Sequence, residues 1–328
     1  MKGLCHARRL AGFFLLTALL AGCAHRPPVT LDPGTRLPPQ AELSDTPFFP
    51  QERYQCGPAA LATLLNVRGV KIDPEALVPQ VYLPAREGSL QTEMIAAVRR
   101  QGLLAIPVEP SLDGLLGEVA AGRPVLVLQN LGLDVLPRWH YAVVIGYDLE
   151  RRHVVLRSGT EARRVTPVGV FMNTWNRSKR WGFVVLAPDD LPPNVEPDAW
   201  LEAASGLEAL GHWPQAHAAY GAATRRWPDH ALAWFGLGNA AYALGDGAGA
   251  EQALRQAIQL RPDWALAWNN LAHVLAQRPC PRAARAAAQC AGRLAPDQAD
   301  IRRTLDSLGG LSAVDGADCA NVPACPLP

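Results

Sequence analysis

The chain has 328 residues, of which 49% are hydrophobic, and its formal net charge at pH 7 is +1. This length allows about two domains, and the hydrophobic content is enough to fill their cores. The near-zero net charge argues against a strongly electrostatic partner such as nucleic acid. The sequence has no phosphate-binding loop, no paired CxxC and no HExxH, so it predicts no cofactor and no metal.

Residues 1–22 have the features of a bacterial secretion signal. Three basic residues precede an apolar segment over 10–20, which is too short to cross a membrane comfortably. The next residues, Leu-Ala-Gly-Cys ending at Cys23, resemble the lipobox of bacterial lipoproteins, in which the cysteine is lipidated. The resemblance implies a lipid anchor on Cys23, and Ala24 implies an outer-membrane lipoprotein that faces the periplasm. The alternative is an ordinary signal peptide with a chance cysteine.

Two segments follow the predicted anchor. Residues 23–44 are rich in proline and polar side chains, and we expect them to form an extended tether. Residues 45–190 predict one α+β domain, because helical patterns come first and strand patterns follow. Helical spacing begins near residues 56, 73, 89 and 112, and apolar runs predict strands over 103–108, 124–128, 140–147, 153–156 and 181–186.

Cys56 is the candidate nucleophile of this domain. It precedes Gly57-Pro58 and an apolar run with helical spacing, and proline is suited to the first turn of a helix. Cys56 is therefore expected at a helix N-terminus, where unpaired N–H groups and the helix dipole favour the thiolate. Gln51, five residues upstream, carries an amide of the kind that holds an oxyanion beside an attacking sulfur. The alternative is a buried, inert cysteine, so catalysis needs a base.

The domain contains two histidines that could serve as this base. His140 opens the first strand of the predicted hairpin, where an imidazole can face a cleft. His153 lies within the hairpin beside two arginines, which favours an exposed polar position. His140 is the stronger candidate.

Gln51, the run from Cys56 to Leu61 (CGPAAL) and the later run from Trp139 to Val144 (WHYAVV) together resemble the bacteriocin-processing cysteine peptidases. The resemblance covers residues 45–190 and implies a papain-like fold. It also implies that Cys56 is the nucleophile, His140 the base and Gln51 the oxyanion donor, although many relatives have the glutamine one residue further from the cysteine.

The third catalytic position departs from the family pattern. The family usually has an aspartate after the second hairpin strand, where this chain has Ser158. Ser158 can accept a hydrogen bond from the histidine ring, but more weakly than a carboxylate. Asn173 and Asn176 are alternative partners for the ring, and Gln55 is a weaker alternative to Gln51. A neutral partner can suffice in a cysteine protease.

Residues 197–308 predict an all-α repeat solenoid. Tryptophan recurs at positions 200, 234 and 268, and proline recurs at 228, 262 and 296. This interval is the tetratricopeptide period, so we expect three repeats of paired helices and a capping helix that bind a protein partner. Pro279 replaces the glycine expected at the third inter-helix turn. Residues 309–328 predict an irregular tail.

Four cysteines near the C-terminus suit an oxidising compartment. Their three possible pairings stay open at this point; the residues are Cys280, Cys290, Cys319 and Cys325.

Taken together, these patterns predict a membrane-anchored cysteine peptidase that cleaves a peptide or protein, with repeats that recruit a partner or substrate. The alternative is a non-catalytic adaptor that binds peptides through a degenerate peptidase-like domain. Transamidation or amide hydrolysis by the same cysteine and histidine is a third possibility.

Overall fold

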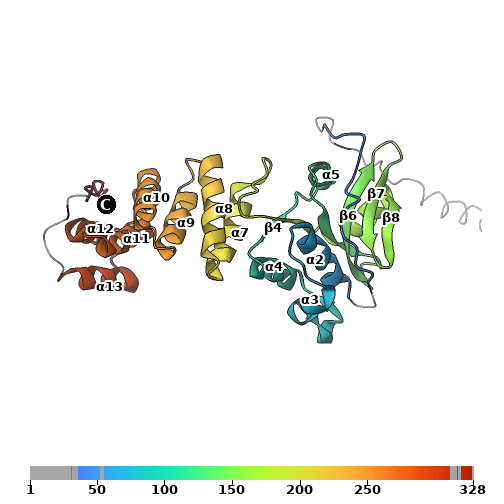
Figure 1. Cartoon of the computed structure of the whole chain (residues 1–328), viewed down its shortest axis with the longest axis horizontal. Helices are drawn as coiled ribbons and strands as arrows, with labels where there is room; N and C mark the ends of the chain where they lie inside the picture. The colour runs from blue at the N-terminus through green and yellow to red at the C-terminus, as the bar shows by residue number, and fades with distance from the viewer. Residues whose placement is uncertain (1–30, 32–35, 52–54, 311–315, 317–318, 327–328) are drawn as a thin grey trace, which may run out of the picture.

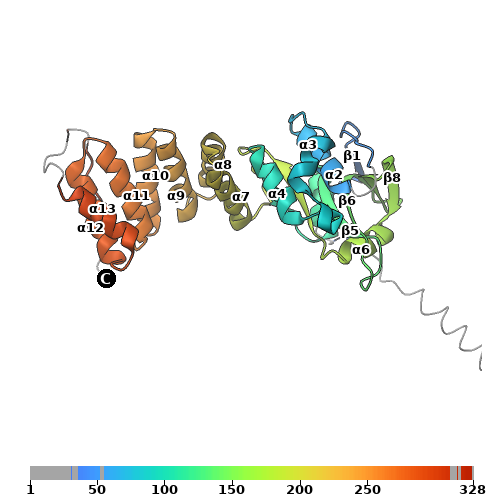
Figure 2. The same cartoon turned by 90° about the horizontal axis from the view of Figure 1, so that it is seen from below.

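The computed structural model describes residues 31, 36–51, 55–310, 316 and 319–326. The predicted signal peptide and the lipid anchor at Cys23 lie outside these residues. A unit of sheet and helices is followed by a row of helices that extends away from it (Figure 1; Figure 2). In the described part of the chain, no helix has both the length and the apolar character that a membrane span requires.

The first unit is built on a seven-stranded sheet whose paired strands are all antiparallel. The strand order is β4-β9-β5-β6-β7-β8, and the short β1 also pairs with β6. Apolar and β-branched residues dominate the central strands, which are buried on both faces. The strands are β1 (Gln40–Glu42), β4 (Leu104–Pro107), β5 (Val125–Asn130), β6 (Trp139–Asp148), β7 (His153–Ser158), β8 (Glu161–Pro167) and β9 (Gly182–Leu186).

Helices cover both faces of this sheet. Successive side chains of a strand point to opposite faces, so each central strand contributes to two cores. Tyr141 and Val143 of β6 pack in one core with α2 (Cys56–Val67), α3 (Pro74–Val81) and α4 (Gln91–Arg100). Ala142 and Val144 pack in the other core with α5 (Leu112–Ala120) and α6 (Val168–Asn176). A small two-stranded sheet, β2 (Tyr82–Leu83) and β3 (Gly88–Ser89), lies between α3 and α4 in the chain.

The structure corrects the end of the predicted tether. Residues 40–42 form β1 and pair with β6, and the hydroxyl of Tyr147 donates a hydrogen bond of 3.2 Å to the carbonyl of Pro38. These residues therefore belong to the sheet unit. Three strand residues beside several prolines are too few to show an alternating pattern, so the sequence does not reveal this strand.

The second unit consists of paired helices in the order that the repeat period predicts. Trp234 and Trp268 each donate an indole N–H hydrogen bond of 2.7 Å to the carbonyl of the proline six residues earlier, Pro228 or Pro262. Trp200 has no such proline and donates to the carbonyl of Ala219 instead. The helices are α7 (Pro197–Ala209), α8 (Trp213–Arg226), α9 (Ala231–Ala243), α10 (Gly247–Leu260), α11 (Ala265–Gln277), α12 (Pro281–Leu294) and α13 (Ala299–Leu308).

The third inter-helix turn differs from the first two, as Pro279 predicts. Gly211 and Gly245 turn the chain with φ angles of 73° and 82°, whereas proline has φ fixed near −65°. At the third turn the carbonyl of Pro279 instead accepts a hydrogen bond of 2.7 Å from the N–H of Gly316. The third turn is therefore also an attachment point for the C-terminal tail.

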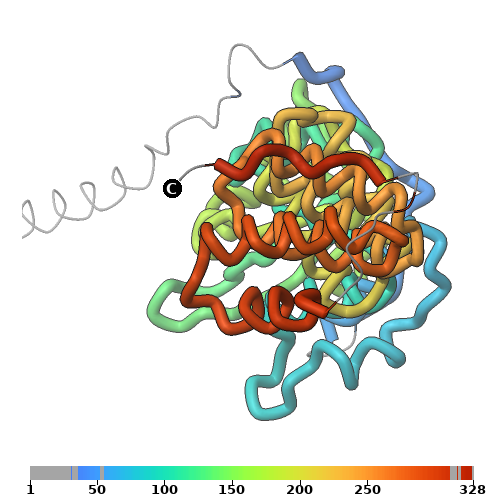
Figure 3. The backbone as a smooth tube through the Cα atoms, turned by 90° about the vertical axis from the view of Figure 1, so that its left-hand side faces the viewer, coloured from blue at the N-terminus to red at the C-terminus, as the bar shows by residue number. Residues whose placement is uncertain are grey.

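Two disulfides fix this tail to the repeat helices. Cys280 pairs with Cys319 and Cys290 pairs with Cys325, which resolves the pairing that the sequence left open. Arg255 of α10 donates hydrogen bonds of 2.8 Å to the carbonyls of residues 320 and 321. The last described residues thus run across the repeat helices (Figure 3).

We expect loss of these disulfides to destabilise the repeat unit. Replacing Cys290 and Cys325 by alanine should lower its stability by about 2–5 kcal/mol, because the cross-link restricts the unfolded chain and holds the tail contacts. Thermal unfolding followed by circular dichroism measures this change. Cys56→Ala is the matched control, since Cys56 forms no disulfide. An unchanged midpoint in the double variant would show that the pair contributes no stability.

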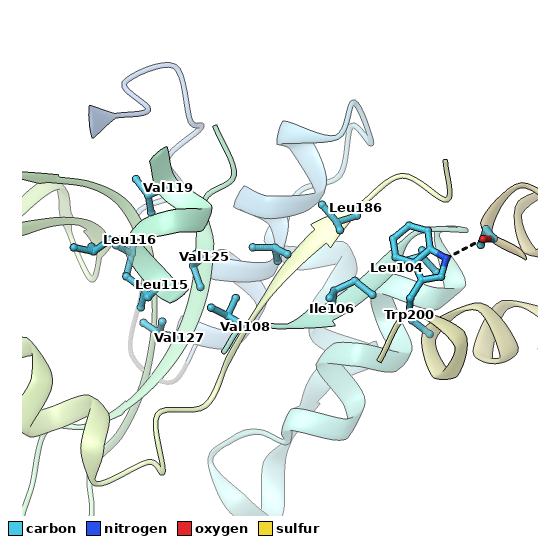
Figure 4. Close-up of a cluster of buried hydrophobic side chains, with 14 of the residues drawn as sticks. Leu104, Ile106, Val108, Leu115, Leu116, Val119, Val125, Val127, Leu186 and Trp200 are labelled. Atoms are coloured by element: carbon cyan, nitrogen blue, oxygen red, sulfur yellow. Dashed lines mark hydrogen bonds between the residues drawn. The ribbon is translucent and has the colours of Figure 1, made fainter. Parts of the chain in front are cut away.

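The two units share one hydrophobic core. Trp200, Leu201 and Leu207 of α7 pack in the same cluster as Leu104 and Leu186 of β4 and β9 (Figure 4). Because β4 is an edge strand, α7 also covers a strand that would otherwise be open to pairing with another chain. The repeats are therefore held against the sheet unit by a packed interface.

Candidate active site

Cys56 is the first residue of α2, at the end of the helix that the sequence predicts. The backbone N–H groups of Tyr141, Gly57 and Cys56 itself interact with its sulfur. The N–H of Tyr141 belongs to the peptide that joins it to His140, so the sulfur lies beside the residue that carries the candidate base. Gly57 lets the first turn of α2 pack closely against Ser89, because a Cβ atom at this position would lie 2.3 Å from Oγ of Ser89.

The state of the Cys56 thiol differs from the expectation based on the helix terminus. Burial raises the pKa of the Cys56 thiol, and the nearby backbone N–H groups oppose this rise without cancelling it. Desolvation disfavours the thiolate more than the three N–H groups favour it. The N–H groups at the helix terminus favour the thiolate, as the sequence predicts, but burial outweighs them and keeps the pKa of the thiol above its ordinary value.

His140 lies near the start of β6, opposite Gln129 of β5. Its Nε2 atom is 2.9 Å from Oγ of Ser158, the last residue of β7. Burial, with a smaller contribution from the positive charge of Arg164, lowers the pKa of His140 to about 4. The ring is therefore neutral at pH 7. No hydrogen bond joins the ring to the Cys56 sulfur among the residues that the structure describes. The bond between Nε2 and Ser158 leaves Nδ1 as the ring nitrogen that can accept a proton.

Gln51 is fixed by the same hairpin turn that carries Ser158. Its Oε1 atom accepts a hydrogen bond of 3.2 Å from the N–H of Gly159, and its own backbone N–H donates one of 3.0 Å to the Gly159 carbonyl. Gly159 has a φ angle of 61°, which suits a glycine in the turn between β7 and β8. With Oε1 occupied, the Nε2 group of Gln51 is the part that can donate to a substrate.

Residues 158 and 159 therefore bind two of the predicted site groups at once, the imidazole of His140 and the amide of Gln51. Ser158 is among the residues that the sequence predicts for the site, whereas Gly159 is not. The only signal was a glycine between two strand patterns, which predicts a turn but not its contact with Gln51.

The other candidates have different partners. Oδ1 of Asn176 accepts a hydrogen bond of 2.7 Å from Arg180, and Gln55 precedes α2 without a side-chain bond to its N-terminus. His153 lies at the opposite end of β7 from Ser158. Asn173 lies on α6, and the hydrogen bond described for the His140 ring goes to Ser158.

Ser158 should position the His140 ring, and its removal should reduce peptide hydrolysis moderately. Loss of one neutral hydrogen bond predicts a decrease in kcat of about tenfold for Ser158→Ala. Ser158→Asp should move the acid limb of the pH–rate profile upward, because a carboxylate at this distance raises the pKa of an imidazole. Ser205→Ala, at an exposed serine of α7, is the control. If both Ser158 variants keep the wild-type rate and profile, Ser158 does not position the ring.

Comparisons with known proteins agree with this description. A model of the Peptidase_C39 like family matches residues 43–182, and a tetratricopeptide repeat model matches residues 201–264. A search of the curated proteins finds no match. The family models confirm both resemblances that the sequence predicts, and with them the α+β peptidase-like fold followed by an α-helical solenoid.

Solved structures similar to parts of the chain include both kinds of domain. A putative C39-like peptidase from Bacillus anthracis is 19% identical over 45% of this chain and 97% of its own, with a TM-score of 0.38. The first TPR of Spaghetti (RPAP3), bound to an HSP90 peptide, is 15% identical over 34% of this chain and 89% of its own, with a TM-score of 0.33. The Yersinia enterocolitica secretion chaperone SycD, in complex with a peptide of the translocator YopD, is 15% identical over 34% of this chain and 90% of its own, with a TM-score of 0.32.

Proposed function

We propose that this chain, a Peptidase_C39-like domain joined to tetratricopeptide repeats, is a cysteine peptidase that cleaves a peptide or protein. The observation that supports the proposal is a set of contacts that connects the segments carrying the three candidate groups. The Cys56 sulfur lies against the peptide after His140, and one turn binds both His140 and Gln51. Nucleophile, base and oxyanion donor are the parts that acyl transfer requires.

The reaction starts from a neutral thiol and a neutral imidazole. As the sulfur of Cys56 attacks the substrate carbonyl, His140 accepts the thiol proton and a C–S bond forms. The carbonyl oxygen becomes an oxyanion, which the backbone N–H of Cys56 and the Nε2 group of Gln51 stabilise. Ser158 holds the ring through Nε2, so Nδ1 exchanges the proton with the sulfur.

Collapse of this intermediate breaks the peptide C–N bond. The imidazolium of His140 gives its proton to the leaving amine, which departs and leaves a thioester on Cys56. His140 then accepts a proton from water as the water oxygen attacks the thioester. The C–S bond breaks, His140 returns this proton to the sulfur, and the new carboxylic acid loses its proton to solvent as it leaves. Protons and bonds therefore balance without a cofactor.

The repeats and the N-terminus complete the proposal. The repeats recruit a substrate or partner protein, and their packed interface with the sheet unit keeps it at a fixed orientation to Cys56. Lipid on Cys23 anchors the protein to the outer membrane, facing the periplasm. The two disulfides support this location, because such bonds persist in oxidising compartments.

One observation favours the second candidate function, a non-catalytic peptide-binding adaptor. Ser158 stands where a carboxylate would stabilise the imidazolium, and burial disfavours the charged forms of both Cys56 and His140. An adaptor would bind peptides at the same place without cutting them.

Hydrolysis of a mixed peptide library, followed by mass spectrometry, distinguishes the two functions. The wild-type protein should produce new carboxyl termini, and Cys56→Ala should produce none. Binding of the same peptides to both proteins without any product would contradict the peptidase and support the adaptor.

A further inference from the structure

The loop between β5 and β6 exposes an unusual number of large apolar side chains. We call residues 131–139, which are this loop and the first residue of β6, the apolar loop. Val135 is 89% exposed and Leu136 is 72% exposed, so these side chains contribute almost nothing to the core. The other exposed apolar residues of the loop are Leu131, Leu133 and Trp139. Several large exposed apolar side chains within one short segment are typical of a binding site.

The backbone of the apolar loop is fixed by polar contacts from beneath it. Asn130 is 2% exposed, and its Oδ1 atom accepts hydrogen bonds of 2.9 Å from the N–H groups of Gly132 and Arg138. Arg177, the residue that follows α6, donates to the carbonyls of Asn130 and Gly132. The N–H of Leu131 donates to the Arg138 carbonyl over 2.8 Å. A partner can therefore bind this surface without first ordering it.

The loop is an extension of the strands that position the candidate base. The β5–β6 register pairs Asn130 with Trp139, and the next pair inward is Gln129 with His140. The last residue of the apolar loop is thus bonded directly to His140.

The chemistry of the proposed reaction decides which part of a substrate lies here. His140 must reach the nitrogen of the leaving amine in order to protonate it. The substrate segment after the scissile bond therefore leaves the site on the His140 side, and the apolar loop is the segment joined directly to His140.

We propose that the apolar loop binds apolar side chains in the substrate segment that follows the scissile bond. This inference rests on the proposed peptidase function. It assigns the substrate class as peptides with large apolar residues directly after the cleaved bond.

The composition of the loop tip favours a peptide over a membrane. Asp134 is exposed between Leu133 and Val135, and inserting the tip into hydrocarbon would bury this carboxylate. A peptide that packs against the neighbouring apolar side chains leaves the carboxylate in water.

The test compares two double variants of the full chain. Leu133→Ser with Leu136→Ser alters the apolar loop, and Val165→Ser with Val170→Ser alters two exposed valines elsewhere in the sheet unit. The substrates are two quenched fluorescent peptides that are identical up to the bond cleaved in the library and then continue with Leu-Phe or Ser-Gly. A second measurement uses Cys56→Ala as background and records equilibrium binding of the labelled Leu-Phe peptide by fluorescence anisotropy.

The loop variant should lose about tenfold in kcat/KM for the Leu-Phe peptide and keep its rate for the Ser-Gly peptide. It should also bind the Leu-Phe peptide about tenfold more weakly, whereas the valine variant should match the wild type in both measurements. If the wild type cleaves neither peptide but the binding loss persists, the peptidase proposal fails and apolar peptide binding by the loop stands.

Two outcomes would overturn the inference. One is equal activity and binding in the loop variant and the wild type. The other is a loop variant that keeps the wild-type preference between the two peptides but no longer binds vesicles of phosphatidylethanolamine and phosphatidylglycerol that the wild type binds. This result would make the loop a membrane contact.

Discussion

Replacing His140 by alanine should reduce peptide hydrolysis by about 10²–10⁴-fold, the usual contribution of a general base. The effect should be large because Cys56 begins the reaction as a thiol, whose pKa burial raises, and cannot attack efficiently without a proton acceptor. Steady-state hydrolysis of one peptide by the two proteins measures it. His153→Ala, at the opposite end of β7 from Ser158, is the matched control and should keep the wild-type rate.

The pH dependence of peptide hydrolysis tests the protonation state of His140. His140 acts as a base only when neutral, and its pKa is lowered to about 4, so the wild-type rate should fall only as the pH drops through about 4. Arg164→Gln removes one cause of the lowered pKa and should move this acid limb upward. An acid limb near pH 6.5, the ordinary histidine value, would contradict the buried, neutral ring.

Replacing Gln51 by glutamate should lower kcat by about 10²–10³-fold, the loss seen when one oxyanion donor is removed. Glutamate keeps an oxygen that can accept from the N–H of Gly159 but has no amide N–H, so it separates the donor from the structural contact. Gln51→Ala removes both and should lose at least as much activity.

The alkylation rate of Cys56 with iodoacetamide is the control for Gln51. It should be nearly the same in wild type and Gln51→Ala, because an oxyanion donor is not needed for alkylation of a thiol. If the Gln51→Glu variant hydrolysed peptide with the wild-type kcat, the Gln51 amide would be excluded as a donor to the oxyanion. The Cys56 backbone N–H would then be left as the proposed donor.

Local signals explain which parts of this account the sequence could predict. The helix start at Cys56 and the recurring tryptophans of the repeats are set by residues close together in the chain, so pattern alone reveals them. Ser158 was named as one possible partner of His140, beside Asn173 and Asn176, because the family resemblance points to that position, and the structure has the hydrogen bond to Ser158.

The features that the sequence did not reveal depend on distant contacts. Gln51 meets Gly159 only after the sheet has formed, and β1 needs β6 as a partner. The helix dipole predicted a thiolate at Cys56, but the packing of α2 against the sheet produced a larger desolvation effect. The exposure of the apolar loop likewise follows from the contacts of Asn130 and Arg177 beneath it.

The most direct test of the central claim is labelling with a peptide that carries a thiol-directed electrophile in place of the scissile bond. Intact mass and peptide mapping would identify the modified residue, and the rate would be compared with that of free cysteine. We expect one adduct, on Cys56. The labelling rate of Cys56 should exceed that of free cysteine, and it should be lower in the His140→Ala variant. No adduct on Cys56, or a rate no faster than free cysteine with or without His140, would contradict a catalytic role and leave the peptide-binding adaptor.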